Sequence, residues 1–348
     1  MVNSLPDLSQ VKFGSMASLS YSVSRGPVLV LLVVIILVYA LRSYLSVPSS
    51  GSLVDRTVTR KQISLLSWNL WYPSFKMRER MEALGQLVQE LEPDILAFQE
   101  VTLQNLALLR NQSWFSKYHL IPADISNEVD HSVVILSVFT VDKWFPHPFK
   151  KAPYTNRKII TAELKNAVLS PRFVIAVTHL VHGRSNTLQR EHQLRETLQV
   201  LSPYDNVCVM GDMNIKSGRA EVDGVVVLPS SWIDVWLSLP GNTEGNGYTF
   251  DQSKNPFAPP KRGAIATKAR FDRVFCKLSD FKVKEMRIVG DKLTKSKIVP
   301  SDHYGLFTVI EQSENTEYKH GIKSPTEEVY FKRPAGWEKL VGQKTKSS

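Results

Sequence analysis

The chain has 348 residues with 43 Lys and Arg against 33 Asp and Glu, a formal net charge of +10, and its 43% hydrophobic and 9% aromatic residues exclude a disordered protein. The length fits one large domain or two, and the positive charge makes nucleic acid, phospholipid or another phosphate ester a candidate partner. Two cysteines are too few for a disulfide framework or a multi-cysteine zinc site, so a metal would need oxygen or imidazole ligands, and a scaffold built for an oxidising compartment is not expected.

The amino-terminal region contains one strongly apolar segment. Sixteen uncharged residues, 26–41, lie between Arg25 and Arg42. As a helix they would be roughly 24 Å long, somewhat shorter than the hydrocarbon core of about 30 Å, and the two arginines could reach toward the interfaces. A membrane anchor is the expectation, with a cleaved targeting segment or a buried core helix as alternatives. The expected organisation of this region is an arm at 1–25, an anchor at 26–45 and a linker at 46–60.

Basic residues are denser on the carboxyl side of the apolar segment than on its amino side. Because positive charge is retained on the cytosolic side of a membrane, this bias predicts a body that faces the cytosol. A nuclear location is the alternative if the segment is not an anchor.

Four short apolar runs further along the chain have the length and composition of buried strands. Each is followed by a polar residue: run 63–68 by Asn69, run 95–99 by Glu100, run 173–178 by His179, and run 207–211 by Asp212 and Asn214. Apolar side chains recur at helical spacing in residues 77–91, and a second helical stretch is expected at about 187–201. The pattern predicts strands that form a core with helices outside them.

Two later segments place polar residues before apolar runs. They are 270–275 and 301–307, and a strand that enters at the second segment from the same edge would bring His303 to the cluster. A histidine needs a carboxylate partner to hold its tautomer and stabilise its cation, and Asp272 or Asp302 can supply one. Each residue alone could merely satisfy a turn. Together they indicate a site for a metal and a phosphate.

Six short motifs carry a family resemblance. In chain order they are Ser67-Trp68-Asn69, Phe98-Gln99-Glu100-Val101, Thr178-His179-Leu180, Gly211-Asp212-Met213-Asn214, Phe271-Asp272-Arg273 and Ser301-Asp302-His303. This order resembles the endonuclease/exonuclease/phosphatase superfamily, whose members have the DNase I-like fold. The resemblance implies an α+β protein with a four-layer α/β/β/α sandwich as a catalytic domain at 61–312, preceded here by a single hydrophobic helix. The charged residues 313–348 are expected to be a mostly disordered tail.

Within the superfamily, segments 232–236, 247–251 and 270–273 look most like those of the 5′-tyrosyl-DNA phosphodiesterases. Those enzymes remove a topoisomerase tyrosine from a DNA 5′ end. The resemblance therefore implies a Mg²⁺-dependent phosphodiesterase that acts on 5′-phosphotyrosyl-DNA linkages or DNA ends in DNA repair, as a monomer. The alternatives are a membrane-anchored lipid phosphodiesterase of the neutral sphingomyelinase type, held at the bilayer through 26–45, and another nuclease of the superfamily.

The resemblance also implies residue roles. Mg²⁺, for which Mn²⁺ could substitute, would be held by Glu100 with help from Asn69. Asp302 is either near the metal or simply a turn residue. Asp212 would orient or deprotonate the attacking water, and Asn214 would donate to the phosphoryl oxygens. His303, held by Asp272, and His179 would stabilise charge in the transition state.

Four further residues are candidates for substrate binding. Phe250 could stack on an exposed base, and Arg184, Lys216 and Arg273 could contact backbone phosphates. For Phe250 the alternative is core packing, and for Arg273 it is a structural ion pair.

Overall fold

The computed structural model describes residues 61–128, 131–150, 156–164, 171–216, 223–293, 298–313 and 330–333, all of which belong to one compact unit. The expected arm, anchor and linker at 1–60 lie outside the described residues. Among the helices of the described residues, none is long and apolar enough to cross a membrane.

The first of two six-stranded sheets has the strand order β14-β15-β1-β2-β4-β3. Its strands are β1 (Gln62–Asn69), β2 (Ile95–Val101), β3 (His119–Ile121), β4 (Ser132–Ser137), β14 (Phe281–Val289) and β15 (Gly305–Gln312). β1 and β2 run parallel, whereas β15 runs antiparallel to β1.

The second six-stranded sheet has the order β10-β13-β8-β7-β6-β5. Its strands are β5 (Val141–Pro148), β6 (Lys158–Leu164), β7 (Val174–His179), β8 (Asn206–Asp212), β10 (Ile233–Asp234) and β13 (Asp272–Leu278). β7 and β8 run parallel, and β13 runs antiparallel to β8. The two sheets therefore share the same arrangement, a central parallel pair flanked by an antiparallel strand.

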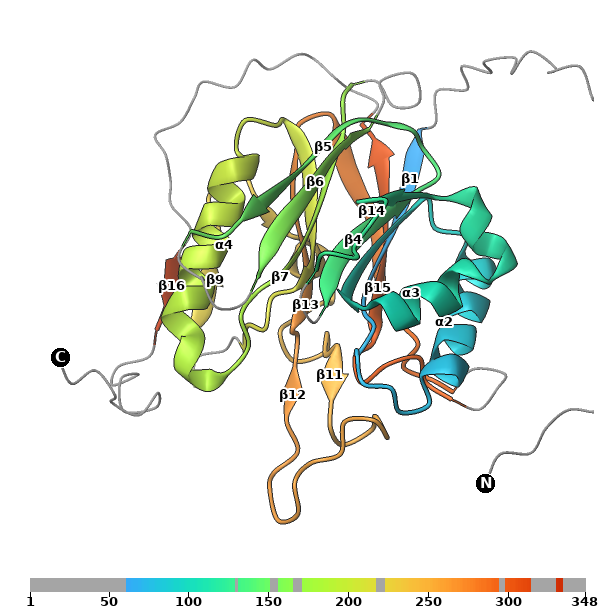
Figure 1. Ribbon diagram of the computed structural model, residues 1–348. Helices are drawn as coiled ribbons and strands as arrows, with labels where there is room; N and C mark the ends of the chain where they lie inside the picture. The colour runs from blue at the N-terminus through green and yellow to red at the C-terminus, as the bar shows by residue number, and fades with distance from the viewer. Residues whose placement is uncertain are drawn as a thin grey trace, which may run out of the picture. The chain divides into compact units, whose positions relative to one another are not determined.

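Helices cover the outer face of each sheet (Figure 1). The first sheet is covered by α2 (Met77–Leu91), α3 (Leu103–Arg110) and the 3₁₀ turn η1 (Ser113–Lys117), and the second by α4 (Thr187–Leu201), which follows η2 (Arg184–Asn186). A short helix, α5 (Val235–Ser238), contributes Val235 and Trp236 to the core between the sheets. The described domain is thus the expected α+β sandwich with layers α/β/β/α, and helices are found at 77–91 and 187–201 as the sequence predicts.

Alternating side chains explain the layers. In β1, Ile63 and Leu65 belong to the apolar core between the two sheets, while Leu66 and Trp68 belong to the core beneath α2. Successive strand residues point to opposite faces, and both faces of this strand are covered. That is why the run reads as continuously apolar in the sequence.

Two small strand pairs lie outside the sheets. β11 (Phe250–Asp251) pairs with β12 (Lys268–Ala269), and their connection extends away from the sandwich (Figure 1). β9 (Val225–Val227) pairs with β16 (Tyr330–Lys332), which belongs to the segment expected to be a mostly disordered tail. Phe331 of β16 is buried in the core beside α4, so this part of the tail packs on the catalytic domain.

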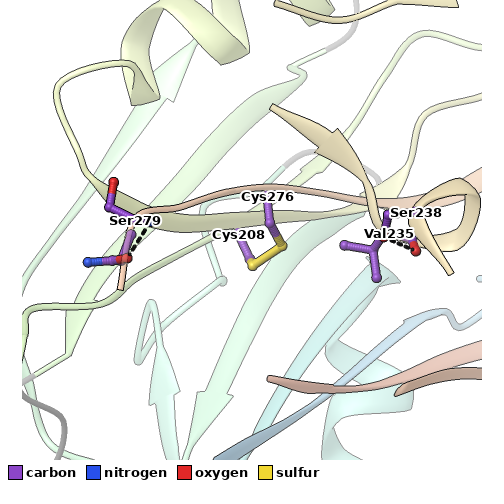
Figure 2. The surroundings of a disulfide bond; sticks show 6 residues. Cys208, Val235, Ser238, Cys276 and Ser279 are labelled. Atoms are coloured by element: carbon purple, nitrogen blue, oxygen red, sulfur yellow. Dashed lines mark hydrogen bonds between the residues drawn. A yellow bond between two sulfur atoms is a disulfide. The ribbon is translucent and has the colours of Figure 1, made fainter. Parts of the chain in front are cut away.

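The two cysteines are joined, which their number alone did not predict. Cys208 of β8 stands directly opposite Cys276 of β13, and their sulfurs form a disulfide (Figure 2). The residues are separated by 68 positions in the sequence, so only the pairing of the two strands brings them together. One bond is still no disulfide framework, in agreement with the expectation from the cysteine count.

Candidate active site

Asp212 is the centre of a polar cluster at one edge of the sandwich. It ends β8, and three side chains from other strands or loops approach its Oδ2 atom: Asn69 Nδ2 at 3.0 Å, His179 Nε2 at 3.3 Å and His303 Nε2 at 3.9 Å. Burial by itself would raise the pKa of Asp212, but the charge and hydrogen bond of His179, followed by the charge of His303, hold it well below its usual value. Asp212 is therefore an ionised, hydrogen-bonded carboxylate.

The Gly-Asp motif lets β8 come close to β7. Gly211 has φ +148°, and a Cβ atom there would lie 1.9 Å from the carbonyl oxygen of Thr178. Only glycine fits at this close approach. In the parallel register that results, His179 stands beside Asp212.

His303 and Asp272 form a buried pair. His303 Nδ1 lies 2.7 Å from Asp272 Oδ2, and Asp272 opens β13 directly opposite Asp212. Burial by itself would lower the pKa of His303, but Asp272, then Asp302 and Asp212, raise it well above its usual value. The pair therefore holds His303 as a cation whose Nε2–H faces the Asp212 side of the site.

The backbone of Glu100 is in an unusual conformation. Its φ of +57° is rare for a residue with a side chain, and the β2–β4 pairing is irregular between Phe98 and Val101. Bulges of this kind redirect a side chain and are common beside active sites. Here the Glu100 carboxylate accepts hydrogen bonds from Asn69 Nδ2 at 3.2 Å and from the Tyr72 N–H at 3.0 Å.

The ionisation of Glu100 is favoured by these neighbours. Burial would raise the pKa of Glu100, but the charge of His179 and the Tyr72 N–H lower it below the usual value. The carbonyl oxygen of the Asn69 side chain accepts the Trp71 N–H at 2.9 Å, so Asn69 presents its amide N–H groups to Glu100 and Asp212. Asn69 thus holds the Glu100 carboxylate and has its own oxygen already in use.

Asp302 supplies a second carboxylate near Glu100. Burial raises the pKa of Asp302 to about 6; the charge of His303 opposes this rise, and the charges of Glu100 and Asp212 add to it. Its Oδ1 lies 3.3 Å from Ser301 Oγ. A carboxylate whose ionisation is opposed by burial and by the charge of a neighbouring carboxylate suits a hard divalent cation with oxygen ligands.

A second group of residues has the chemistry to hold a metal. Potential ligand atoms of Asp212, Asp272 and His303 all lie within 4.8 Å of one another. Two of these residues are already bound to each other through His303 Nδ1 and Asp272 Oδ2. Glu100 and Asp302 are the other candidate metal ligands. Among the described residues, neither carboxylate forms a hydrogen bond with a histidine of the kind that joins Asp272 to His303.

Asn214 stabilises the loop after β8. It has φ +51°, its backbone N–H donates to Asp212 Oδ1 at 2.8 Å, and its side-chain Nδ2 donates to the Leu180 carbonyl at 3.0 Å. The carboxamide expected to contact phosphate thus uses one N–H to join the loops after β7 and β8. Its second N–H faces no acceptor among the described residues.

Phe250 forms part of the wall of the site. Its ring centroid lies 5.2 Å from that of His303 and 5.4 Å from that of Phe271, and the side chain is only partly buried. The alternative of core packing therefore does not describe it fully, because part of the residue remains exposed. Phe271 belongs to a recognised motif but was not singled out by the sequence.

Arg273 does not fit the expected contact with DNA. Its side chain is 1% exposed, and its guanidinium pairs with Asp234 Oδ2 at 3.0 Å and Glu244 Oε1 at 3.4 Å. Arg270 pairs with the same two acids. This network corrects the assignment of Arg273 to phosphate binding, because a buried guanidinium that is already shared between two carboxylates cannot reach a nucleic acid backbone. The sequence alternative, a structural ion pair, describes Arg273.

The other two basic candidates lie on loops at the site edge. Arg184 is exposed in η2, after β7, and Lys216 follows the Gly-Asp-Met-Asn segment with its backbone N–H bound to Asp223 Oδ2 at 2.8 Å. Neither loop position contradicts a contact with phosphate.

Several neighbours of the site escaped the sequence reasoning. The His131 ring stacks 5.7 Å from that of His179, and the Arg157 guanidinium lies within 3.5 Å of the His179 carbonyl oxygen. The Ser301 hydroxyl donates to the Asn69 carbonyl at 2.6 Å and accepts the His303 N–H at 3.2 Å. Only Ser301, the first residue of the Ser-Asp-His motif, carried a signal that could have identified it.

A family model places these residues in context. The model described as "Endonuclease/Exonuclease/phosphatase family" matches residues 66–303, a range that contains all the residues of the cluster. Among curated proteins, the chain is 25% identical over 272 residues to a 5′-tyrosyl-DNA phosphodiesterase of Caenorhabditis elegans, with 75% of this chain and 71% of that protein covered. A protein of the same name from Caenorhabditis briggsae is 23% identical, with 74% of each chain covered.

Solved structures share the fold. A structure described as D. rerio TDP2 complexed with single strand DNA product has a TM-score of 0.63 and 18% sequence identity, and the match covers 73% of this chain and all of that one. A truncated Caenorhabditis elegans TDP2 has a TM-score of 0.60 and 23% identity, covering 72% of this chain and 98% of that one.

Proposed function

This chain belongs to the endonuclease/exonuclease/phosphatase family and is a metal-dependent phosphodiesterase or nuclease, and from that premise we propose that it hydrolyses phosphodiester bonds at DNA 5′ ends. We take the 5′-phosphotyrosyl linkage as its preferred bond, since the curated relatives that it matches over about three quarters of its length bear the name 5′-tyrosyl-DNA phosphodiesterase. The substrate places the enzyme in DNA repair, and it would act as a monomer.

The observation that carries this proposal is the convergence on Asp212. One carboxylate oxygen is approached by an amide and two imidazoles that come from three other segments, and the second imidazole is paired with its own buried carboxylate, Asp272. Hydrogen-bond donors around an ionised acid match a reaction in which water attacks a phosphate. Packing alone does not call for so many buried polar groups.

Asp212 would orient the attacking water. Its lowered pKa means that it stays ionised throughout the physiological range, so it can always accept a hydrogen bond from water. The same low pKa makes it a weak acceptor for a whole proton, so its main contribution would be to align the water for in-line attack.

The two histidines would stabilise the phosphate as charge develops on its non-bridging oxygens. His303 is held as a cation by Asp272, and its Nε2 is 3.9 Å from Asp212, too far for a hydrogen bond. The Nε2–H is therefore available to an oxygen of the substrate. His179 would act in the same way from the end of β7, the strand next to β8.

Glu100 and Asp302, with Asn69 orienting Glu100, would hold Mg²⁺, and Mn²⁺ could substitute. A bound divalent cation would neutralise phosphate charge and assist departure of the leaving group. A tyrosine phenolate has a pKa of about 10, so it leaves more readily than an alkoxide and has less need of a dedicated acid.

Aromatic side chains would bind the DNA end. Phe250 lines the site beside His303, and Tyr72 and Phe75 lie on the loop that follows Asn69 with 51% and 58% of their surface exposed. Exposed aromatic rings stack on unpaired bases without regard to sequence. Arg184 and Lys216 would add contacts to backbone phosphates.

The alternative of a lipid phosphodiesterase is not favoured. It would use the same phosphate chemistry at a bilayer surface, but the relatives found by sequence are named for a DNA substrate.

The test compares substrates with the purified full chain. A 5′-phosphotyrosyl oligonucleotide, an abasic DNA duplex and sphingomyelin vesicles are assayed with Mg²⁺ and with EDTA. We expect the first to be hydrolysed with the highest kcat/KM and EDTA to abolish the reaction. Preference for sphingomyelin, or full activity in EDTA, would overturn the proposal.

One variant tests the assigned centre of the site. Asp212→Asn should lower kcat at least about a hundredfold while the far-ultraviolet circular dichroism spectrum stays unchanged. Asp205→Asn, at an exposed residue just before the same strand, is the matched control and should retain activity. Turnover by Asp212→Asn within a few fold of wild type would remove Asp212 from the mechanism.

A further inference from the structure

The disulfide lies in the core between the two sheets. Cys208 and Cys276 are the only cysteines of the chain, and both side chains are 0% exposed. They face each other across the β8–β13 pair (Figure 2). Both belong to the apolar core that lies between the two sheets. The bond is thus sealed inside the folded domain.

The burial of the disulfide indicates when it forms. Thiol–disulfide exchange requires a thiolate to reach a sulfur atom of its partner, and no exchange partner can reach sulfurs that have no exposed surface. The two cysteines must therefore be oxidised before the sheets close over them. The bond consequently reports the compartment in which the chain folds, and the cytosol and nucleus keep thiols reduced.

A second, independent feature suits the same compartment. Asn111-Gln112-Ser113 is the only Asn-X-Ser/Thr sequence in the chain. Asn111 ends α3, Ser113 begins η1, and both residues are exposed. The eight residues of α3 separate this site by about 12 Å from the start of the helix, which lies at the catalytic edge. A glycan attached there would lie on the helical layer and leave the catalytic edge open.

From these two features we infer that the catalytic domain folds in an oxidising compartment of the secretory pathway, where Cys208 and Cys276 are joined and Asn111 receives an N-linked glycan. Two thiols lose two protons and two electrons to the disulfide of an oxidoreductase, which becomes a dithiol. The Asn111 amide nitrogen bonds to the first sugar of a polyprenyl-diphosphate-linked oligosaccharide, with loss of a proton and release of the diphosphate.

The inference reverses the orientation expected from charge. The basic residues around the apolar segment 26–41 predict a cytosolic body, whereas the covalent chemistry places the body on the opposite side of the membrane. The bond chemistry of the proposed function is unaffected. What changes is the setting, because a domain folded in the secretory pathway would meet DNA outside the cytosol and nucleus. If the inference holds, the assignment to DNA repair made above falls and the phosphodiesterase chemistry remains.

The disulfide is tested by counting thiols in the full chain made in eukaryotic cells. Cells are quenched in acid, and the denatured protein is treated with a polyethylene glycol maleimide before and after reduction. We expect no adduct before reduction and two after it. Cys276→Ser is the matched control and should show one adduct without reductant. Two adducts on the unreduced wild-type chain would overturn the inference.

The glycan is tested on the same protein. Peptide N-glycosidase should increase the gel mobility of the wild-type chain and of Ser113→Thr, which keeps the acceptor sequence. It should not alter Ser113→Ala or Asn111→Gln. An unchanged mobility of wild type would overturn the inference. Both readouts report covalent state and neither depends on activity, so failure here is distinguishable from failure of the proposed phosphodiesterase function.

Discussion

The buried pair of His303 and Asp272 offers a sharp test of the site. Asp272→Asn keeps the shape of the side chain but removes the charge that His303 Nδ1 meets at 2.7 Å. Asp272 is 1% exposed, so solvent cannot replace the lost partner. The substitution therefore changes the electrostatics of the pair with little change in packing.

The magnitude follows from the hydrogen bond. A bond to a charged partner contributes about 1.5–3 kcal/mol, and if that whole amount is lost in the transition state, kcat/KM falls by roughly ten- to 150-fold.

The pH dependence has a definite sign. The cation of His303 is present below its raised pKa and is lost as the pH rises through it. Without Asp272 that pKa falls, so the alkaline limb of activity moves to lower pH.

The assay is kcat/KM on a 5′-phosphotyrosyl oligonucleotide across the range in which histidine titrates. Asp280→Asn is the matched control: it lies just beyond the far end of β13, and its carboxylate accepts a hydrogen bond from Asn206 Nδ2 at 2.7 Å. It should leave the alkaline limb in place. The role of the pair would be refuted if Asp272→Asn left the alkaline limb of the pH–activity profile in place and lowered kcat/KM by less than about tenfold.

Three further substitutions address the metal, the substrate and the ion-pair network. Glu100→Gln should raise the Mg²⁺ concentration for half activation at least about tenfold and weaken Mg²⁺ binding in calorimetry; an unchanged metal dependence would remove Glu100 as a ligand. Phe250→Ala should raise KM for an oligonucleotide by about five- to 150-fold through lost stacking while Phe250→Trp preserves it, and an equal effect on a small aryl phosphodiester would argue against base stacking. Arg273→Met should lower the free energy of unfolding in urea by about 3–5 kcal/mol, because Asp234 and Glu244 lose a buried partner, without altering the salt dependence of DNA binding; a shallower salt slope would show that Arg273 contacts phosphates.

The strands of the core could be predicted because their signals are local. An uninterrupted apolar run such as 207–211 indicates a strand covered on both faces, and the spacing of apolar residues in 77–91 indicates an amphipathic helix. Both appear in the structure with nearly the predicted bounds, as β8 and α2. The polar residue after each run was also visible, since a buried strand that ends in Asp or His is unusual without a partner.

The partners of these residues could not be predicted from the same signals. The local pattern left Asp272 or Asp302 as the partner of His303, and only the family resemblance implied Asp272. The structure shows the hydrogen bond to Asp272, which stands opposite Asp212 in the register of β13 against β8. Arg273 follows Asp272 in a recognised motif, yet its side chain leaves the site for Asp234 and Glu244. Adjacent strand residues point to opposite faces, so neighbours in the sequence have different surroundings.

The sequence by itself determined that strands form a core with helices outside it, and which polar residues end the strands, because side-chain periodicity is a property of a few consecutive residues. The order of its motifs carried the family resemblance, which implied the four-layer fold. Only the tertiary structure decided that Asp212 receives an amide and two imidazoles, that Glu100 turns into the site from an irregular stretch of strand, and that Cys208 meets Cys276. These contacts join segments that are far apart in the chain. They depend on the order and register of strands, which the packing of the whole core selects.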